Sequence, residues 1–145
     1  MQIPEEIRAP ARLDNLYPLL GFVTSYAKRH GAGQERINEI DLVMEELLVN
    51  IFNYAYPDRS GDVEITCRSD EAGRLQVEIA DQGVPFNILT RDDPDREAGI
   101  EERTVGGLGI FFVKRLVREI QYRREGERNI LTLTVDPAPA SLGDA

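Results

Sequence analysis

Hydrophobic residues in the first half of the chain recur every three to four positions over two long segments. The first segment, residues 12–30, stops at Gly31, and glycine commonly follows the end of a helix. The second segment, residues 34–56, stops before Pro57, which cannot continue a helix. This spacing predicts two consecutive amphipathic helices.

Other segments alternate between apolar and polar residues, which is typical of strands with one buried face. The predicted strands are an opening strand over 2–8, a pair over 63–68 and 75–81 joined by the turn 70–73, and a final hairpin over 120–124 and 129–135 with its turn at 125–127. A third helix, ending at about Glu119, is predicted before the hairpin. Helices and strands therefore mix along the chain.

Residues 84–105 show little periodicity and contain several prolines and acidic side chains. We interpret them as a long mobile loop, and a loop of this length in a compact domain is usually functional. After Asp136 a tail rich in proline and alanine, residues 137–145, is expected to be disordered. The chain of 145 residues is therefore predicted to form one domain, residues 1–136.

Composition indicates the environment of the protein. The sequence has one cysteine, Cys67, and neither a signal peptide nor a membrane span is recognisable, so we expect a cytoplasmic protein. The formal net charge of −9 argues against nucleic acid and anionic membranes as partners, because their phosphates would repel the chain. The arginines between residues 118 and 128 are better explained as a solvated face.

The turn Gly106-Gly107-Leu108-Gly109 precedes an apolar, helix-like run. Glycines let backbone N–H groups approach a ligand closely, and the first turn of a helix adds unpaired donors. Such a turn suits a phosphate group. The simpler alternative is that the glycines only start a helix.

Three polar residues, Glu46, Asn50 and Asn53, share one face of the second predicted helix within a mostly apolar run. A buried amide needs a partner or a ligand, because leaving it unpaired costs free energy. Asn50 could offer an amide oxygen to Mg²⁺, and Glu46, one turn earlier, could accept a proton from an attacking hydroxyl. Alternatively, Glu46 and Asn53 lie at the water edge and Asn50 bonds to the backbone.

The segment Asp81-Gln82-Gly83-Val84-Pro85-Phe86 ends the third predicted strand. A carboxylate can accept a hydrogen bond from the exocyclic amine of adenine, by the logic that lets acidic side chains read cytosine in DNA. Gly83 would then allow the ring to lie against the backbone. The alternative is an ordinary turn, which glycine and proline also suit.

In this order, the Glu46 to Asn50 motif, the Asp81 to Phe86 motif and the glycines at 106–109 resemble the N, G1 and G2 boxes of the GHKL ATPases, which share the Bergerat fold. The resemblance spans most of the chain. It implies a two-layer α/β sandwich, with a mixed, largely antiparallel sheet, three helices on one face, and ATP between the helices and a lid. The length leaves no room for the further domains of a sensor histidine kinase or gyrase, so the chain looks like the small anti-sigma-factor serine kinases.

The resemblance also implies roles for single residues. Glu46 is the general base, Asn50 the Mg²⁺ ligand and Asp81 the adenine contact, while residues 89–105 form the lid. The other implied nucleotide contacts are Asn53, Gly83, Pro85, Phe86, Arg103, Thr104, Gly106, Gly107, Leu108 and Gly109, with Arg103 and Thr104 at the γ-phosphate. Pro85 stands where many relatives have a second glycine, Tyr54 replaces a frequent basic or histidine position, and the lid is short and acidic.

The function that the resemblance implies is an ATP-dependent protein serine/threonine kinase that uses Mg²⁺ and forms a homodimer. It would bind a sigma factor and phosphorylate a serine on an antagonist of the anti-sigma factor. The alternative is a non-catalytic switch protein of the same fold, which binds nucleotide and sequesters or activates a partner; Glu46 favours the enzyme, because such a protein needs no base. A dinucleotide-binding domain fits poorly, since the glycines follow a loop and lack the full spacing.

Overall fold

The computed structural model describes residues 3–90 and 109–138. Within them the chain forms helices and strands in the predicted order. The helices are α1 (Leu16–Arg29), α2 (Gln34–Tyr54) and α3 (Gly109–Leu116), with two short 3₁₀ turns, η1 (Leu13–Asn15) and η2 (Ile88–Thr90). The strands are β1 (Glu5–Pro10), β2 (Asp62–Ser69), β3 (Leu75–Asp81), β4 (Glu119–Glu125) and β5 (Arg128–Val135).

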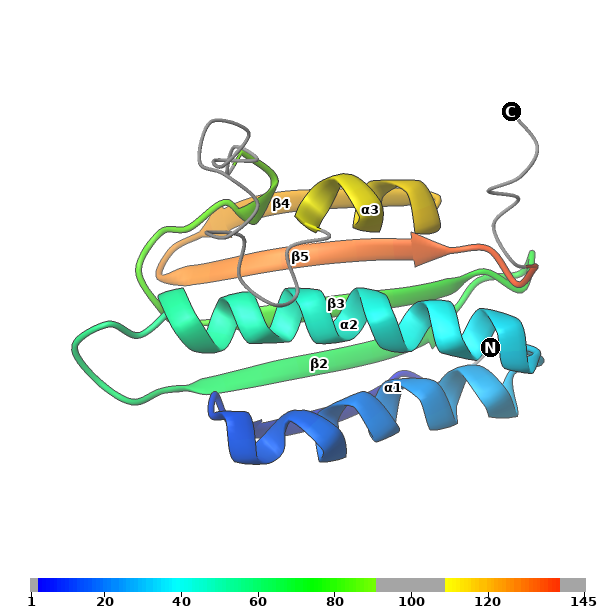
Figure 1. Ribbon diagram of the computed structural model, residues 1–145, viewed down its shortest axis with the longest axis horizontal. Helices are drawn as coiled ribbons and strands as arrows, with labels where there is room; N and C mark the ends of the chain where they lie inside the picture. The colour runs from blue at the N-terminus through cyan, green and yellow to red at the C-terminus, as the bar shows by residue number, and fades with distance from the viewer. Residues whose placement is uncertain (1–2, 91–108, 139–145) are drawn as a thin grey trace, which may run out of the picture.

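The five described strands form one sheet in the order β1-β2-β3-β5-β4, and each pairing between them is antiparallel. The last strand, β5, therefore lies inside the sheet, between β3 and β4. The helices cover one face of this sheet, with α2 in the middle (Figure 1). The predicted two-layer α/β sandwich with a largely antiparallel sheet is confirmed.

The two layers share a core because side chains alternate along each strand. In β2, Val63, Ile65 and Cys67 are fully buried, while the residues between them point to the other face. From α2, Leu47 and Leu48 are also fully buried. Burying a leucine side chain contributes about 2 kcal/mol to stability, so this core holds α2 firmly against the sheet.

Some element ends differ from the predicted ones. The first strand covers Glu5–Pro10 in place of 2–8, because its register against β2 gives each of these residues a partner. The third helix ends at Leu116, before the predicted end, because the chain enters β4 at Glu119. Periodicity in a sequence indicates an element, but pairing with a neighbour decides where it ends.

The predicted mobile loop 84–105 lies only partly within the described residues. Its first part, residues 84–90, is anchored: it contains η2, and Ile88 is buried in the core. The remainder of the loop falls in the range 91–108, and most of the predicted tail falls in 139–145, both outside the part that the structure describes. No described helix has the length and apolar character that crossing a membrane requires.

Candidate functional site

Asp81 is the last residue of β3, and only 6% of its surface is exposed. Its Oδ1 atom accepts hydrogen bonds from the Gly83 backbone N–H at 2.8 Å and from Asn129 Nδ2 at 2.9 Å. Oδ2 makes no hydrogen bond within the described residues, where no fully buried side-chain oxygen lacks a partner, so Oδ2 keeps some contact with solvent. The carboxylate is thus held by one oxygen and presents the other.

Sequence reasoning missed Asn129, a buried residue of β5 that fixes the turn after β3. Its amide nitrogen donates to Asp81 and, at 2.8 Å, to the Val84 carbonyl. Its amide oxygen accepts from the Phe86 N–H at 3.2 Å and from the Tyr122 hydroxyl at 2.6 Å. These bonds use the full hydrogen-bonding capacity of one amide, so Asp81 and the turn are held together from the neighbouring strand.

Gly83 packs against the C-terminal end of α2. A Cβ atom on Gly83 would lie 2.2 Å from the Ala55 carbonyl oxygen, a distance that no side chain tolerates. The same carbonyl accepts a hydrogen bond from the Val84 N–H at 2.9 Å, and Arg124 donates to the Gly83 carbonyl at 2.8 Å. Packing against Ala55 therefore already requires glycine at position 83. The close approach of a ligand, which the sequence suggested, would be a second reason.

The polar face of α2 leads toward this turn. Glu46 and Asn50 are half-buried, and Asn53 is exposed. Asn50 Nδ2 donates to the Glu46 carbonyl at 2.7 Å, one turn earlier in the same helix. This is the backbone bond expected if Asn50 has only a structural role. It involves the amide nitrogen, whereas a metal ion would bind the amide oxygen.

An aromatic pair joins the end of α2 to the turn after β3. The rings of Tyr54 and Phe86 lie with their centroids 5.4 Å apart. Phe86 is half-buried and its neighbour Pro85 is exposed. The pair puts apolar surface next to Asp81 and Gly83.

Gly109 is the one residue of the predicted phosphate turn that the structure describes. It begins α3 with a φ of 66°, in the left-handed region that favours glycine. The other members of that turn, Gly106, Gly107 and Leu108, and the lid residues Arg103 and Thr104 lie in the range 91–108 and remain predictions. Helix α3 contacts α2 and lies on the same side of the sheet (Figure 1).

Comparison with known proteins places this geometry in a family. A family model for the histidine kinase-like ATPase domain matches residues 9–135, which is most of the chain. The chain belongs to the histidine kinase-like ATPase domain family. The three motifs therefore lie inside a known ATPase domain, as their order predicted.

Relatives of this ATPase domain include serine-protein kinases named RsbW from Bacillus mycoides (strain KBAB4) and Bacillus cereus (strain AH820). Each is 25% identical over 130 residues, which cover 87% of this chain and 81% of the relative. Among solved structures, the RsbU and RsbW domains of Rv1364c from Mycobacterium tuberculosis match with a TM-score of 0.66 and 17% identity, covering 93% of this chain and 32% of that one. The histidine kinase domain of a blue-light activated kinase from Erythrobacter litoralis matches with a TM-score of 0.53 and 23% identity, covering 87% and 61%. Both structures support the fold, and this ATPase domain corresponds to less than two thirds of either solved chain.

A metal ion in this ATPase domain would depend on few protein ligands. Within residues 3–90 and 109–138, no group of three or more His, Cys, Asp or Glu side chains could hold a metal. The candidate donors on the polar face of α2 are oxygens of Asn50 and Glu46, which suit the hard ion Mg²⁺. Such an ion commonly takes its other ligands from substrate phosphates and water, so the residues present fit Mg²⁺ brought in with a nucleotide.

A cavity of about 500 Å³ opens behind Asp81, on the other face of the sheet. Its lining includes Tyr56, whose hydroxyl donates to the Asp62 carbonyl at 2.6 Å and accepts from the Gln82 N–H at 2.8 Å. Burial raises the pKa of the Tyr56 hydroxyl above its ordinary value. Asp81 is paired in register with the core residue Val63, so its side chain points to the helix-covered face. Asp81 is nevertheless among the residues that line the cavity, so the cavity borders the end of β3 that carries the candidate nucleotide site.

Proposed function

We propose that this histidine kinase-like ATPase domain is an ATP-dependent protein serine kinase that acts as an anti-sigma regulatory factor. The observation that carries the proposal is the Asp81 carboxylate, which is held through Oδ1 by two donors and keeps some contact with solvent at Oδ2. The serine-protein kinase names of the RsbW relatives support the choice of reaction.

An open acceptor oxygen in this position suits adenine. The exocyclic amine of adenine donates a hydrogen bond, whereas guanine has a carbonyl oxygen at the corresponding position and would be repelled by a carboxylate. The rings of Tyr54 and Phe86 supply apolar surface for a flat base beside the same turn. We therefore assign the base to Asp81 and the turn after β3, including Gly83 and Pro85.

The phosphates of ATP are assigned to the space between α2 and the start of α3. Asn50 would ligate Mg²⁺ through its amide oxygen, and the exposed Asn53 lies on the same face of α2. A bound Mg²⁺ would neutralise negative charge on the phosphates. Gly109 would contribute a backbone contact, together with residues of the same predicted turn at 106–108.

The proposed chemistry is phosphoryl transfer to a serine hydroxyl. The serine Oγ atom attacks the γ-phosphorus of ATP, and a new O–P bond forms as the bond from that phosphorus to the bridging oxygen breaks. ADP leaves with the electron pair of that bond. Glu46 accepts the hydroxyl proton on its carboxylate, from a half-buried position one helical turn before Asn50.

For partners we propose a sigma factor and an antagonist protein that carries the target serine, with the chain acting as a cytoplasmic homodimer. The second candidate is a nucleotide-binding switch protein without catalysis. One observation favours it: the Asn50 amide bonds to the backbone of its own helix, as a purely structural amide would.

The proposal is tested by incubating the purified chain with Mg²⁺, γ-labelled ATP and candidate antagonist proteins. We expect label on a serine of one candidate, and no transfer when EDTA removes the metal. ATP binding without transfer to any candidate would favour the switch protein. A chain that does not bind ATP would exclude both functions.

A further inference from the structure

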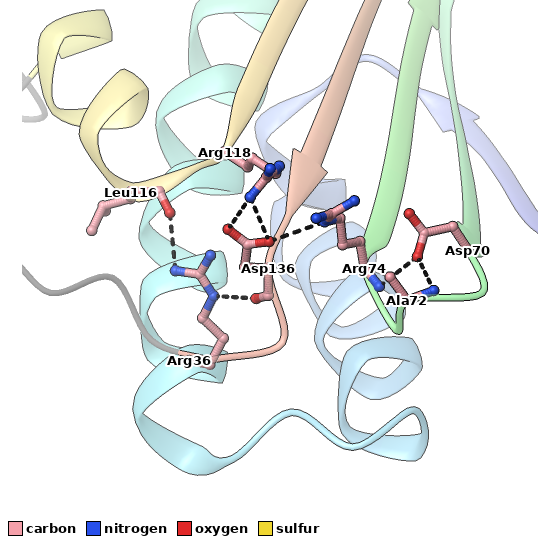
Figure 2. A network of polar contacts seen from close by, with 7 residues as sticks. All are labelled: Arg36, Asp70, Ala72, Arg74, Leu116, Arg118 and Asp136. Carbon is pink, nitrogen blue, oxygen red and sulfur yellow. Dashed lines mark hydrogen bonds and ion pairs between the residues drawn. The ribbon is translucent and has the colours of Figure 1, made fainter.

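Arg36, near the start of α2, is a buried arginine with no part in the nucleotide site described above. It is 2% exposed. Its Nε donates to the Asp136 carbonyl at 2.8 Å, and its Nη1 donates to the Glu39 carboxylate at 2.7 Å and to the Leu116 carbonyl at 2.9 Å. Figure 2 shows the guanidinium group between α2, the end of α3 and the segment that follows β5.

Asp136, the residue after β5, extends this network. Its carboxylate accepts hydrogen bonds from Arg74 at 3.3 Å and from Arg118 at 3.4 Å (Figure 2). Arg118 lies just beyond α3, so two interactions hold the C-terminal end of this helix: the bond from Arg118 to Asp136 and the bond from Arg36 to the Leu116 carbonyl. The Arg118 bond is half exposed and therefore weak, whereas the Arg36 bond to Leu116 is buried.

The buried tie requires an arginine. A charged group out of contact with water must be paired and hydrogen-bonded, and Glu39, at 13% side-chain exposure, supplies the countercharge. The planar guanidinium group also reaches carbonyls of two other segments at once, which a lysine ammonium group cannot do. Arg36 therefore joins three elements with one side chain.

The other end of α3 is Gly109, the last residue of the predicted phosphate turn. Helix α3 lies along α2 and runs in the opposite direction (Figure 1). At about 1.5 Å per residue, Gly109 lies roughly 10 Å from Leu116 along α3, and Glu46 lies roughly 15 Å from Arg36 along α2. The hydrogen bond between Arg36 and the Leu116 carbonyl thus fixes the position of α3 along α2, and with it the position of Gly109 relative to the polar face of α2.

We propose that Arg36 is a positioning residue for the phosphate end of the nucleotide site, because it holds α3 so that Gly109 stays in place beside α2. This inference rests on the proposed function, since it needs the phosphates of ATP to bind at the start of α3. Adenine is held elsewhere, by Asp81 at the end of β3. Loss of Arg36 therefore weakens phosphate contacts and leaves base contacts intact.

The test compares binding of Mg²⁺-ATP and of adenosine to the full chain by calorimetry. We expect Arg36→Met to lower ATP affinity about tenfold, the scale of one lost charge-assisted hydrogen bond, and adenosine affinity about twofold at most. Arg36→Lys should fall between this variant and the wild type, because lysine can keep the Glu39 pair. Arg29→Met is the control: Arg29 ties α1 to β1 through Glu5 at 2.8 Å, away from α3, and both affinities should stay unchanged.

An Arg36→Met protein that loses affinity equally for ATP and adenosine, or for neither, overturns the inference, because a general loss of stability cannot separate the two ligands. If this variant does not fold, Arg36→Lys decides the question, and a wild-type ratio of the two affinities overturns the inference. A wild-type chain that gains no affinity from the phosphates contradicts the proposed function itself. The two failures are therefore distinguishable.

Discussion

Asn129 Nδ2 donates a hydrogen bond of 2.9 Å to Oδ1 of Asp81, its register partner across β3 and β5. Because the amide takes up Oδ1, the open acceptor Oδ2 has a fixed direction. That direction is set by two paired strands in the middle of a sheet, and sites on rigid elements are more precise than sites on loops. The fold itself therefore holds the carboxylate to which we assign the base.

Replacing Asp81 by asparagine tests the adenine contact. The new amide oxygen can still accept from Gly83 and Asn129, which turns the NH₂ group toward the position of Oδ2. A donor would then face the exocyclic amine of adenine, so we expect ATP and adenosine affinities to fall about tenfold or more with the fold intact. Calorimetry measures the affinities and circular dichroism the fold. Equal affinities in both proteins would remove Asp81 as the base contact.

Truncating Asn129 tests the network around the turn. Asn129→Ala leaves several buried groups without a partner and should lower the free energy of unfolding by about 3 kcal/mol. Tyr122→Phe removes one of the same hydrogen bonds and should cost about 1 kcal/mol. Urea unfolding measures both. If the two variants unfold at the same urea concentration, the amide does not organise the turn.

Glu46 and Asn50 can be separated by their kinetic and binding effects. Glu46→Gln should keep ATP affinity and lose about 10² to 10⁴ in phosphotransfer rate, because it removes the group that we propose as the general base. Asn50→Ala should lose the part of ATP affinity that depends on Mg²⁺ and keep the affinity measured in EDTA. Transfer assays and calorimetry give the two readouts. Unchanged turnover in Glu46→Gln would favour the switch protein.

Gly83→Ala tests the contact between the turn and α2. The added Cβ would meet the Ala55 carbonyl oxygen at 2.2 Å, so the end of α2 must shift, and we expect a loss of about 2 kcal/mol in stability. Gly21→Ala in α1 is the matched control: apart from the backbone of α1 itself, no atom lies within 4 Å of the position that its Cβ would take, and alanine should stabilise the helix by about 0.5 to 1 kcal/mol. Thermal unfolding compares the two. A Gly83→Ala protein as stable as the wild type would show that the end of α2 can move aside with no loss in the free energy of unfolding.

Local patterns predicted most of the architecture, because each amphipathic helix or alternating strand carries its signal within a short window. That is why α2 and the β2–β3 pair appear in the structure close to their predicted bounds. The order of the three motifs then indicated the family, which the match to residues 9–135 confirms.

Contacts between distant residues could not be predicted in this way. Arg36 bonds to Leu116 and to Asp136, 80 and 100 residues further along the chain, and in the sequence it is one more charged residue on an amphipathic helix. Asn129 follows the predicted turn at 125–127 and resembles an ordinary hairpin residue. Gly83 illustrates the same limit: a sequence shows that glycine is present, but not which neighbour requires it.

The chain leaves the sheet after Asp81, returns to it in β4, and comes back beside Asp81 in β5, where Asn129 is the register partner of Asp81. The intervening segment, residues 82–128, therefore begins and ends at two residues that are joined by one hydrogen bond. Closing a longer loop costs only about 0.6 kcal/mol for each doubling of its length. Changes of length between Asp81 and Asn129 that leave α3 and β4 intact should therefore cost the fold little, and the hydrogen-bonded pair of Asp81 and Asn129 can stay the same through them.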